Sequence, residues 1–201
     1  MRDKRLVAAL LALMALGMTA CSKAPEQAIQ TSSAAMEEAK AAGAETYASD
    51  ALQKAQDLMN QADAEKKTQD EKFVLFRSYK DSEGLYNQAA AEFASAKQAA
   101  AAGKEQTRAD ATAAIDGAKA AVAAAREALA GAPKSKDSKA DLDLWANDLN
   151  TYDATIVEAE GAMTTEDYLG AKAQADSVTA KAGEISASIQ AAIEKVQATR
   201  R

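Results

Sequence analysis

Apolar residues recur at alternating steps of three and four positions along most of this 201-residue chain. The strictest run comprises Leu142, Trp145, Leu149, Tyr152, Ile156, Ala159 and Met163. The same rhythm continues through Tyr168, Ala171, Ala175, Val178, Ala182, Ile185, Ile189, Ala192 and Val196. Such a narrow stripe is typical of helices in a coiled coil or bundle, and a short turn between two of them predicts an antiparallel hairpin. The pattern therefore predicts an all-α fold of elongated antiparallel helical bundles or coiled-coil hairpins.

The first part of the chain carries a weaker version of this pattern. It predicts one helix over about 26–42, ended by Gly43 in a left-handed cap. A second helix is expected to begin with Ser49 or Asp50 as its N-cap. The polar stretch 65–70 is expected to be a turn, with a helical continuation as the alternative.

Residues 71–130 are predicted to form either one very long helix or two stacked helices. The first half carries the aromatic residues Phe73, Phe76, Tyr79, Tyr86 and Phe93, the last three at seven-residue spacing. This aromatic set is predicted to be the core of the segment, or else a groove for a partner. The second half is out of phase, because Phe93 and Ile115 are 22 rather than 21 residues apart. We expect a kink or a break at Gly103, which lies between them.

Turn signals separate this segment from the helices that follow it. Gly131 and Pro133 end the segment, because glycine suits a C-cap and proline cannot continue a helix. Ser138, with an acidic residue three positions on, resembles a capping box for the next helix. Thr164 or Thr165 is expected to cap the last helix.

The first twenty residues have the order of a removable signal peptide. Basic residues, including Lys4 and Arg5, precede an apolar run of 15 residues from Leu6 to Ala20. A membrane-spanning helix needs about 20 apolar residues, so this run is short for a transmembrane anchor. Small residues at its end, followed by a polar stretch, are typical of a cleavage site.

The sequence Met18-Thr19-Ala20-Cys21 resembles the lipobox of bacterial lipoproteins. The resemblance implies that the Cys21 sulfur receives a diacylglyceryl group, that cleavage precedes Cys21, and that its amine is then acylated. Two or more acyl chains hold a protein stably on a membrane, whereas one does so marginally. In lipoproteins of bacteria with two membranes, an aspartate after the cysteine favours the inner membrane. Because Ser22 stands there, the resemblance implies an outer-membrane anchor facing the periplasm, or the cell membrane in an organism with one membrane. The alternative is an ordinary secretory signal followed by a chance cysteine.

Composition narrows the functional classes. Without residues 1–20 the chain keeps 21 Lys and Arg against 29 Asp and Glu, which argues against nucleic acid as a partner. There is no histidine, no glycine-rich phosphate loop and no Gly-x-Ser-x-Gly motif, so we expect no enzyme. Cys21 is the only cysteine, which excludes an intramolecular disulfide, and the covalent lipid on it is the only cofactor expected.

The stretch Ala41-Ala42-Gly43-Ala44-Glu45-Thr46-Tyr47-Ala48, with Leu52 and Ala55 after it, resembles the alanine-rich lipoprotein family called domain of unknown function 4398. The resemblance covers roughly residues 26–100, with a weaker echo over 142–182. It implies helices behind a lipobox and no catalytic residues. Some members precede an OmpA-like peptidoglycan-binding domain, for which this chain has no alternating strand and helix pattern after position 141.

These patterns predict a membrane-anchored envelope lipoprotein. The expected organisation is a signal peptide at 1–20, a lipidated N-terminus and linker at 21–28, a helical domain at 29–130, a loop at 131–140 and a helical hairpin at 141–198. We expect it to be a non-catalytic structural or adaptor module that binds an envelope protein or peptidoglycan through its helix faces. The alternative function is non-covalent binding of peptidoglycan or another glycan.

Overall fold

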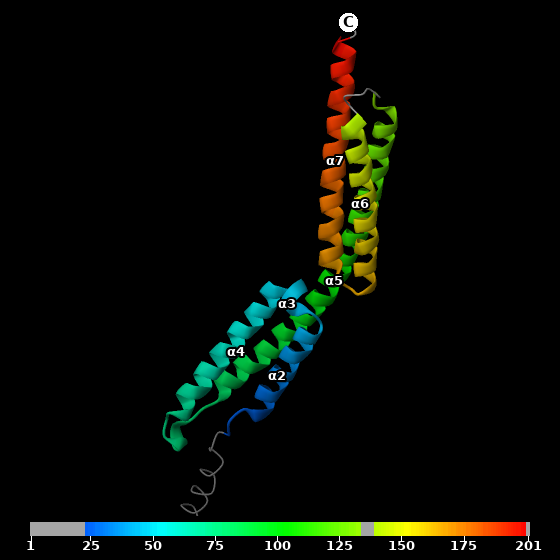
Figure 1. The fold of residues 1–201 in the computed structure, drawn as a ribbon. Coiled ribbons are helices and arrows are strands. Elements are labelled where there is room, and N and C mark those ends of the chain that lie inside the picture. Colours follow the sequence, from blue (N-terminus) through cyan, green and yellow to red (C-terminus); the bar gives the residue numbers. More distant parts are fainter. Residues whose placement is uncertain (1–22, 134–138, 200–201) are drawn as a thin grey trace, which may run out of the picture. The chain divides into compact units, whose positions relative to one another are not determined.

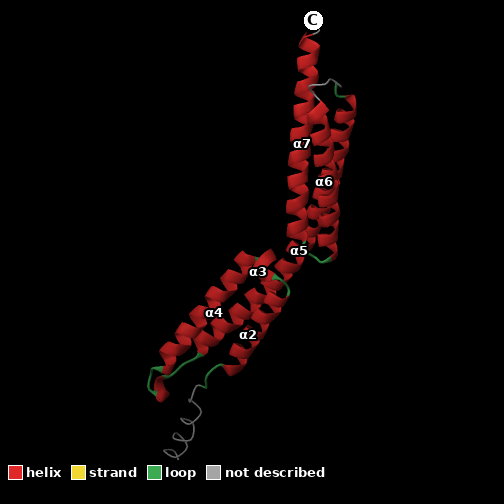
Figure 2. Ribbon diagram, in the orientation of Figure 1, coloured by secondary structure: helices red, strands yellow, loops and turns green. Residues whose placement is uncertain are grey.

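A computed structural model of the protein describes residues 23–133 and 139–199, and within these ranges it is helical with no strand (Figure 2). The α-helices in these ranges are α2 (Glu26–Ala41), α3 (Ala44–Tyr47), α4 (Ser49–Asp70), α5 (Lys80–Gly131), α6 (Lys139–Thr164) and α7 (Tyr168–Thr199). A 3-10 helix, η2 (Val74–Phe76), lies between α4 and α5. The helices pack into bundles, which confirms the predicted all-α class.

The chain divides into two compact units at Gly103, inside α5. Unit 1 contains α2, α3, α4 and the first part of α5, and unit 2 contains the rest of α5 with α6 and α7 (Figure 1). Each unit is therefore a bundle of three long helical segments. The predicted boundary placed 29–130 apart from the hairpin 141–198, and this division is wrong. The second half of α5 shares one apolar core with α6 and α7, so it belongs to unit 2.

The core of unit 1 consists of small alanine side chains around two large aromatic ones. Tyr86 and Phe93 on α5 are fully buried, and Leu52 on α4 is almost so. The buried alanine residues of the same clusters are small enough to let the helices approach closely around these rings. The Tyr86 hydroxyl donates a hydrogen bond of 2.5 Å to Oδ1 of Asp63 on α4. Two effects raise the pKa of Tyr86 well above its usual value: burial of the phenol, which is the larger effect, and the hydrogen bond with Asp63.

The core of unit 2 follows the predicted seams of α6 and α7. Leu149 and Ile156 from α6 are buried against Val178 and Ile189 from α7. From α5, residues of the second half complete the core: Ala111, Ile115, Ala118, Val122 and Ala125. Trp145 packs partly buried against this cluster.

The helix ends observed in unit 1 agree in part with those predicted from the sequence. Gly43 has φ +83° and its N–H bonds to the carbonyl of Lys40, which confirms the left-handed cap that ends α2. The helix α2 begins at Glu26, which agrees with the helix predicted over about 26–42. The linker predicted for 21–28 is therefore too long by its last three residues. The stretch 65–70 forms the end of α4, which agrees with the helical alternative and not with the turn. Within it, Lys66 pairs with Asp70 one turn later along the helix.

The predicted N-caps of two helices are also wrong. The N-cap of α4 is Ala48, which offers no side-chain hydrogen bond, so neither Ser49 nor Asp50 caps that helix. At the start of α7, Oδ1 of Asp167 accepts the N–H of Gly170 at 3.0 Å. The hydroxyls of the expected caps, Thr164 and Thr165, instead donate to carbonyls of the last turn of α6. The candidate cap Ser138 lies outside the described residues.

The helix α5 is continuous through Gly103, which agrees with the prediction of one very long helix rather than two and excludes a break at this residue. On a straight α-helix, positions seven residues apart rotate by about 20° around the helix axis with each heptad. One extra residue between the two halves of α5 offsets the rotation accumulated over several heptads, so the phase slip does not require a break. The glycine has a different role. A Cβ atom at Gly103 would lie 2.6 Å from the carbonyl oxygen of Tyr47, at the end of α3. Gly103 therefore permits a close approach between α5 and the α3–α4 junction within unit 1.

Candidate functional site

The segment between α4 and α5 presents four consecutive apolar side chains to solvent. Phe73, Leu75 and Phe76 are 66%, 67% and 75% exposed, and Val74 is 44% exposed. The two phenylalanine rings lie against each other at a centroid distance of 6.3 Å, tilted by 52°. The N–H of Phe76 bonds to the carbonyl of Phe73 at 2.8 Å and closes the 3-10 turn. We call residues 73–76 the apolar tip.

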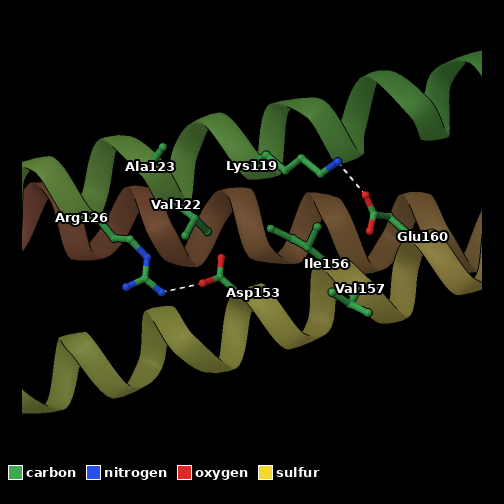
Figure 3. A pocket seen from close by; sticks show the side chains of 8 residues that line it. All are labelled: Lys119, Val122, Ala123, Arg126, Asp153, Ile156, Val157 and Glu160. Carbon is green, nitrogen blue, oxygen red and sulfur yellow. Dashed lines mark hydrogen bonds and ion pairs between the residues drawn. The ribbon is translucent and has the colours of Figure 1, made fainter.

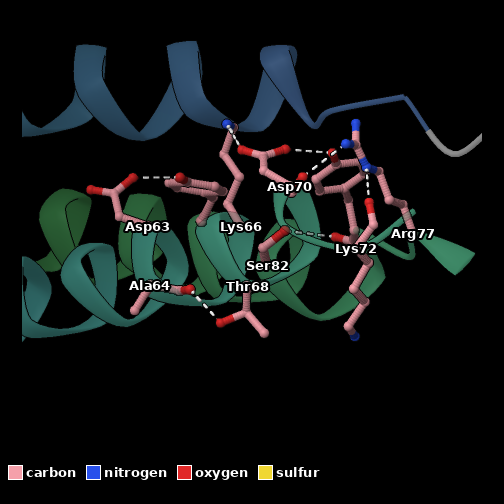
Figure 4. Close-up of polar contacts among 10 residues, drawn as sticks. Asp63, Ala64, Lys66, Thr68, Asp70, Lys72, Arg77 and Ser82 are labelled. Carbon is pink, nitrogen blue, oxygen red and sulfur yellow. Dashed lines mark hydrogen bonds and ion pairs between the residues drawn. The ribbon is translucent and has the colours of Figure 1, made fainter. Parts of the chain in front are cut away.

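Hydrogen bonds from Arg77 fix one side of the base of this loop (Figure 4). Its Nε donates to the carbonyl of Lys72 at 2.9 Å, and its Nη2 donates to the carbonyl of Asp70 at 2.8 Å. One guanidinium group thus joins the end of α4 to the chain on the far side of the tip. Such paired donation from a planar group restricts the backbone on both sides of a loop.

Side chains at the end of α4 fix the other side of the base (Figure 4). Asp70 accepts a hydrogen bond from the Tyr79 hydroxyl at 2.5 Å and forms an ion pair with Lys66 at 2.8 Å. Oε1 of Gln69, which is buried, accepts the N–H of Ser78 at 3.1 Å. The hydrogen bonds from Lys66 and Tyr79 lower the pKa of Asp70, and the same contact with Asp70 raises the pKa of Tyr79. The base is thus held by polar contacts, while the tip has no polar side chain.

The structure separates the five aromatic residues that the sequence grouped. Tyr79, Tyr86 and Phe93 are buried, which agrees with the interpretation of a core. Phe73 and Phe76 are exposed and lie outside the helix that their neighbourhood predicted. The uninterrupted run of four apolar residues between Lys72 and Arg77 is the signal that distinguishes the tip, because it does not fit the three-and-four rhythm.

An open groove of about 300 Å³ runs between α5 and α6 in unit 2 (Figure 3). Its apolar floor includes Val122 and Ile156. Ion pairs border it, Lys119 with Glu160 at 2.6 Å and Arg126 with Asp153 at 2.5 Å. These charges neutralise each other, and the lining of the groove contains no aromatic ring on which a sugar could stack. We therefore assign no ligand to this groove.

The described residues show neither a helix that could span a membrane nor a cluster that could bind a metal ion. Within 23–133 and 139–199, none of the helices is both long and apolar enough to cross a membrane. In the same part of the chain, His, Cys, Asp and Glu residues form no group that could hold a metal ion. The candidate lipidation site Cys21 and its neighbours Met18, Thr19 and Ala20 lie outside the described residues.

Comparisons with models of known protein families, with characterised proteins and with solved structures find no significant match to this chain. The lipobox and the resemblance to domain of unknown function 4398 therefore stay predictions from the residues themselves.

Proposed function

We propose that this protein is a lipid-anchored, non-catalytic lipoprotein of the bacterial cell envelope, and that it binds partners through the faces of its helical bundles. The observation that carries this proposal is the sequence Met18-Thr19-Ala20-Cys21 behind a basic and then apolar leader. The described helices begin at Glu26, only a few residues after the cysteine. In this proposal Cys21 bears the lipid, and the folded units start directly behind the anchor.

The electrostatics of the bundles support a non-catalytic role. Several residues with shifted pKa values stand in separate surface pairs: Glu160 raises the pKa of Lys119, and Lys104 lowers that of Glu166. Others lie together at the base of the apolar tip, where the contacts of Lys66, Asp70 and Tyr79 hold the loop. Groups that perform acid–base chemistry usually converge in a cleft, where burial and neighbouring charges tune them together. Isolated exposed pairs are instead typical of solvated helix faces. This pattern favours binding through surfaces over chemistry in a pocket.

The proposed location follows from the resemblance to lipoproteins. Ser22 rather than aspartate after the cysteine favours the outer membrane, with the bundles in the periplasm. A side-chain charge of −8 on residues 21–201 gives little attraction to anionic headgroups, so the acyl chains must supply most of the membrane affinity.

Lipidation is tested by expressing the full chain and a Cys21→Ser variant in a diderm bacterium with labelled palmitate. We expect the natural chain to carry the label, to sediment with outer membranes and to gain the mass of its acyl chains. The variant should carry no label and should appear in the soluble periplasmic fraction. A Cys21→Ser protein that still sediments with membranes would overturn the proposed lipid anchor.

Binding through helix faces is tested by in-cell crosslinking from exposed positions of each unit, followed by mass spectrometry. An envelope protein crosslinked from one helix face, and lost when residues of that face are changed, is the expected result. The alternative, direct glycan binding, is tested with isolated peptidoglycan sacculi and the purified chain. Cosedimentation with protein-free sacculi would replace the adaptor proposal by this alternative.

A further inference from the structure

We infer that the apolar tip inserts into the lipid bilayer next to the anchor and holds unit 1 end-on against the membrane. This inference rests on the proposed lipidation of Cys21 for its setting in the cell. It concerns residues 73–76, which the proposed function leaves without a role. The tip contacts the interfacial region of the bilayer, between headgroups and acyl chains, where aromatic side chains are favoured.

The first argument is the place of the tip. The start of α2 and the loop between α4 and α5 lie at the same end of unit 1 (Figure 1). Ala28, Ala62 and Tyr86 pack in one cluster, so these positions of α2, α4 and α5 lie at one level along the bundle. From that level, α4 continues eight residues to Asp70, an advance of about 12 Å. The tip therefore projects beyond the start of α2 by roughly 10 Å.

The second argument is the length of the tether. Pro25 is buried, and its carbonyl accepts the N–H of Ile29, so the chain is fixed to the bundle at this residue. Four residue steps join Pro25 to Cys21, and they span at most about 14 Å when fully extended. This reach matches the projection of the tip. A lipid-bearing Cys21 at the headgroups thus brings residues 73–76 to the surface of the same bilayer.

The third argument is the chemistry of the tip and its support. Two phenylalanines, a leucine and a valine form a continuous apolar surface, and basic residues, Lys72 and Arg77, flank it directly in the chain. Apolar side chains set between basic ones suit the boundary between acyl chains and anionic headgroups. The contacts of Arg77 and Asp70 hold the base of the loop, which reduces the ordering needed when the tip inserts.

The experiment tests insertion of the tip without depending on lipidation in cells. Cys21 is the only thiol in the chain, so it can be attached to lipid chemically. The purified chain beginning at Cys21 is coupled through this thiol to maleimide-headgroup phospholipid. The vesicles contain phosphatidylethanolamine and phosphatidylglycerol, with brominated acyl chains as quenchers. Trp145→Phe removes the natural tryptophan, and Phe76→Trp places a reporter in the tip. The matched control is Thr46→Trp, an exposed residue of α3 at the other end of unit 1.

We expect the emission of the tryptophan at position 76 to shift to shorter wavelength and to be quenched by bromolipid, and that of the control at position 46 to be unaffected. A Leu75→Trp reporter should show the same quenching, and adding Phe73→Ser and Phe76→Ser should lower its inserted-to-free ratio by about tenfold or more. Thermal stability should stay unchanged in these variants, because the replaced rings are exposed.

Unquenched emission at position 76 on coupled vesicles overturns the inference, and would point to a protein partner for the tip instead. Failure of Cys21 labelling in cells leaves this vesicle result intact and refutes only the proposed anchor. The two failures are therefore distinguishable.

Discussion

Replacing Gly103 by alanine should destabilise unit 1, although the substitution lies inside a long helix. In a helix interior, glycine to alanine ordinarily stabilises by about 0.5–1 kcal/mol, because alanine loses less backbone entropy on folding. At Gly103 the added Cβ would meet the carbonyl oxygen of Tyr47 at 2.6 Å and the Cβ of Tyr47 at 3.2 Å. The nearest atom belongs to the backbone, so a side-chain rotation cannot relieve the contact. The α3–α4 junction must move instead.

The magnitude follows from these opposing terms. Overpacking a well-packed contact costs about 1–3 kcal/mol, which exceeds the gain in helix propensity. We expect a net loss of about 1 kcal/mol for Gly103→Ala, or roughly 4–8 °C in the melting temperature of a unit of this size. The matched control is Gly84→Ala in the same helix and the same unit, where an added Cβ meets nothing within 4 Å. That variant should gain about 0.5–1 kcal/mol.

The assay is thermal and urea unfolding followed by helical circular dichroism. The only tryptophan, Trp145, lies in unit 2, so its fluorescence reports that unit separately. The expected loss for Gly103→Ala appears in the circular dichroism of unit 1. If Gly103→Ala stabilises the protein as much as Gly84→Ala does, the close approach of the Tyr47 carbonyl to α5 is refuted.

Two further predictions concern hydrogen bonds that the structure assigns. Asp167→Ala should cost about 1 kcal/mol, because it removes the N-cap of α7, whereas Thr165→Ala should change stability by less than about 0.5 kcal/mol; equal losses in urea titrations would contradict this assignment. Tyr86→Phe should cost about 1 kcal/mol at neutral pH through the lost hydrogen bond to Asp63. Because the folded-state pKa of Tyr86 is raised, the protonated phenol stabilises the fold fully below about pH 10, the unfolded value, and progressively less above it. The melting temperature of the natural chain should fall more steeply than that of Tyr86→Phe in that alkaline range, and parallel curves would show that this phenol is not involved.

The sequence was most informative where one helix face packs against the core over many turns. In α6 and α7 the three-and-four rhythm continues without interruption, and residues such as Leu149 and Ile189 are fully buried as it predicted. Gly43 was equally clear, since a glycine at φ +83° after a helix has a local physical cause. In these cases the decisive forces act within a few residues of the signal.

The predictions failed where the spacing of apolar residues indicates which residues are buried but not which residues are helical. Tyr79 follows the seven-residue spacing of Tyr86 and Phe93 and is buried, yet it precedes α5 and is not helical. Spacing alone cannot separate these cases, because a residue just before a helix can pack on the same core. The phase slip marked Gly103, where the two units divide, but the assignment of the second half of α5 to unit 2 was missed for a related reason. Which helices α5 contacts depends on Tyr47 and on α6 and α7, all far away in the sequence.

The apolar tip is an exception to the burial of large apolar side chains in this protein, and it lies outside the core of unit 1. Residues 71–79 could join α4 to α5 with polar side chains alone, since short connections between helices of a bundle need no apolar residue. The chain instead exposes Phe73 and Phe76 and fixes their support through Arg77 and Asp70. Folding gains little from the exposed rings, so the stability of unit 1 does not account for them. An apolar surface on a fixed support is explained by contact with an apolar environment outside the bundle. With the proposed lipid on Cys21, the short tether makes the bilayer the nearest such environment.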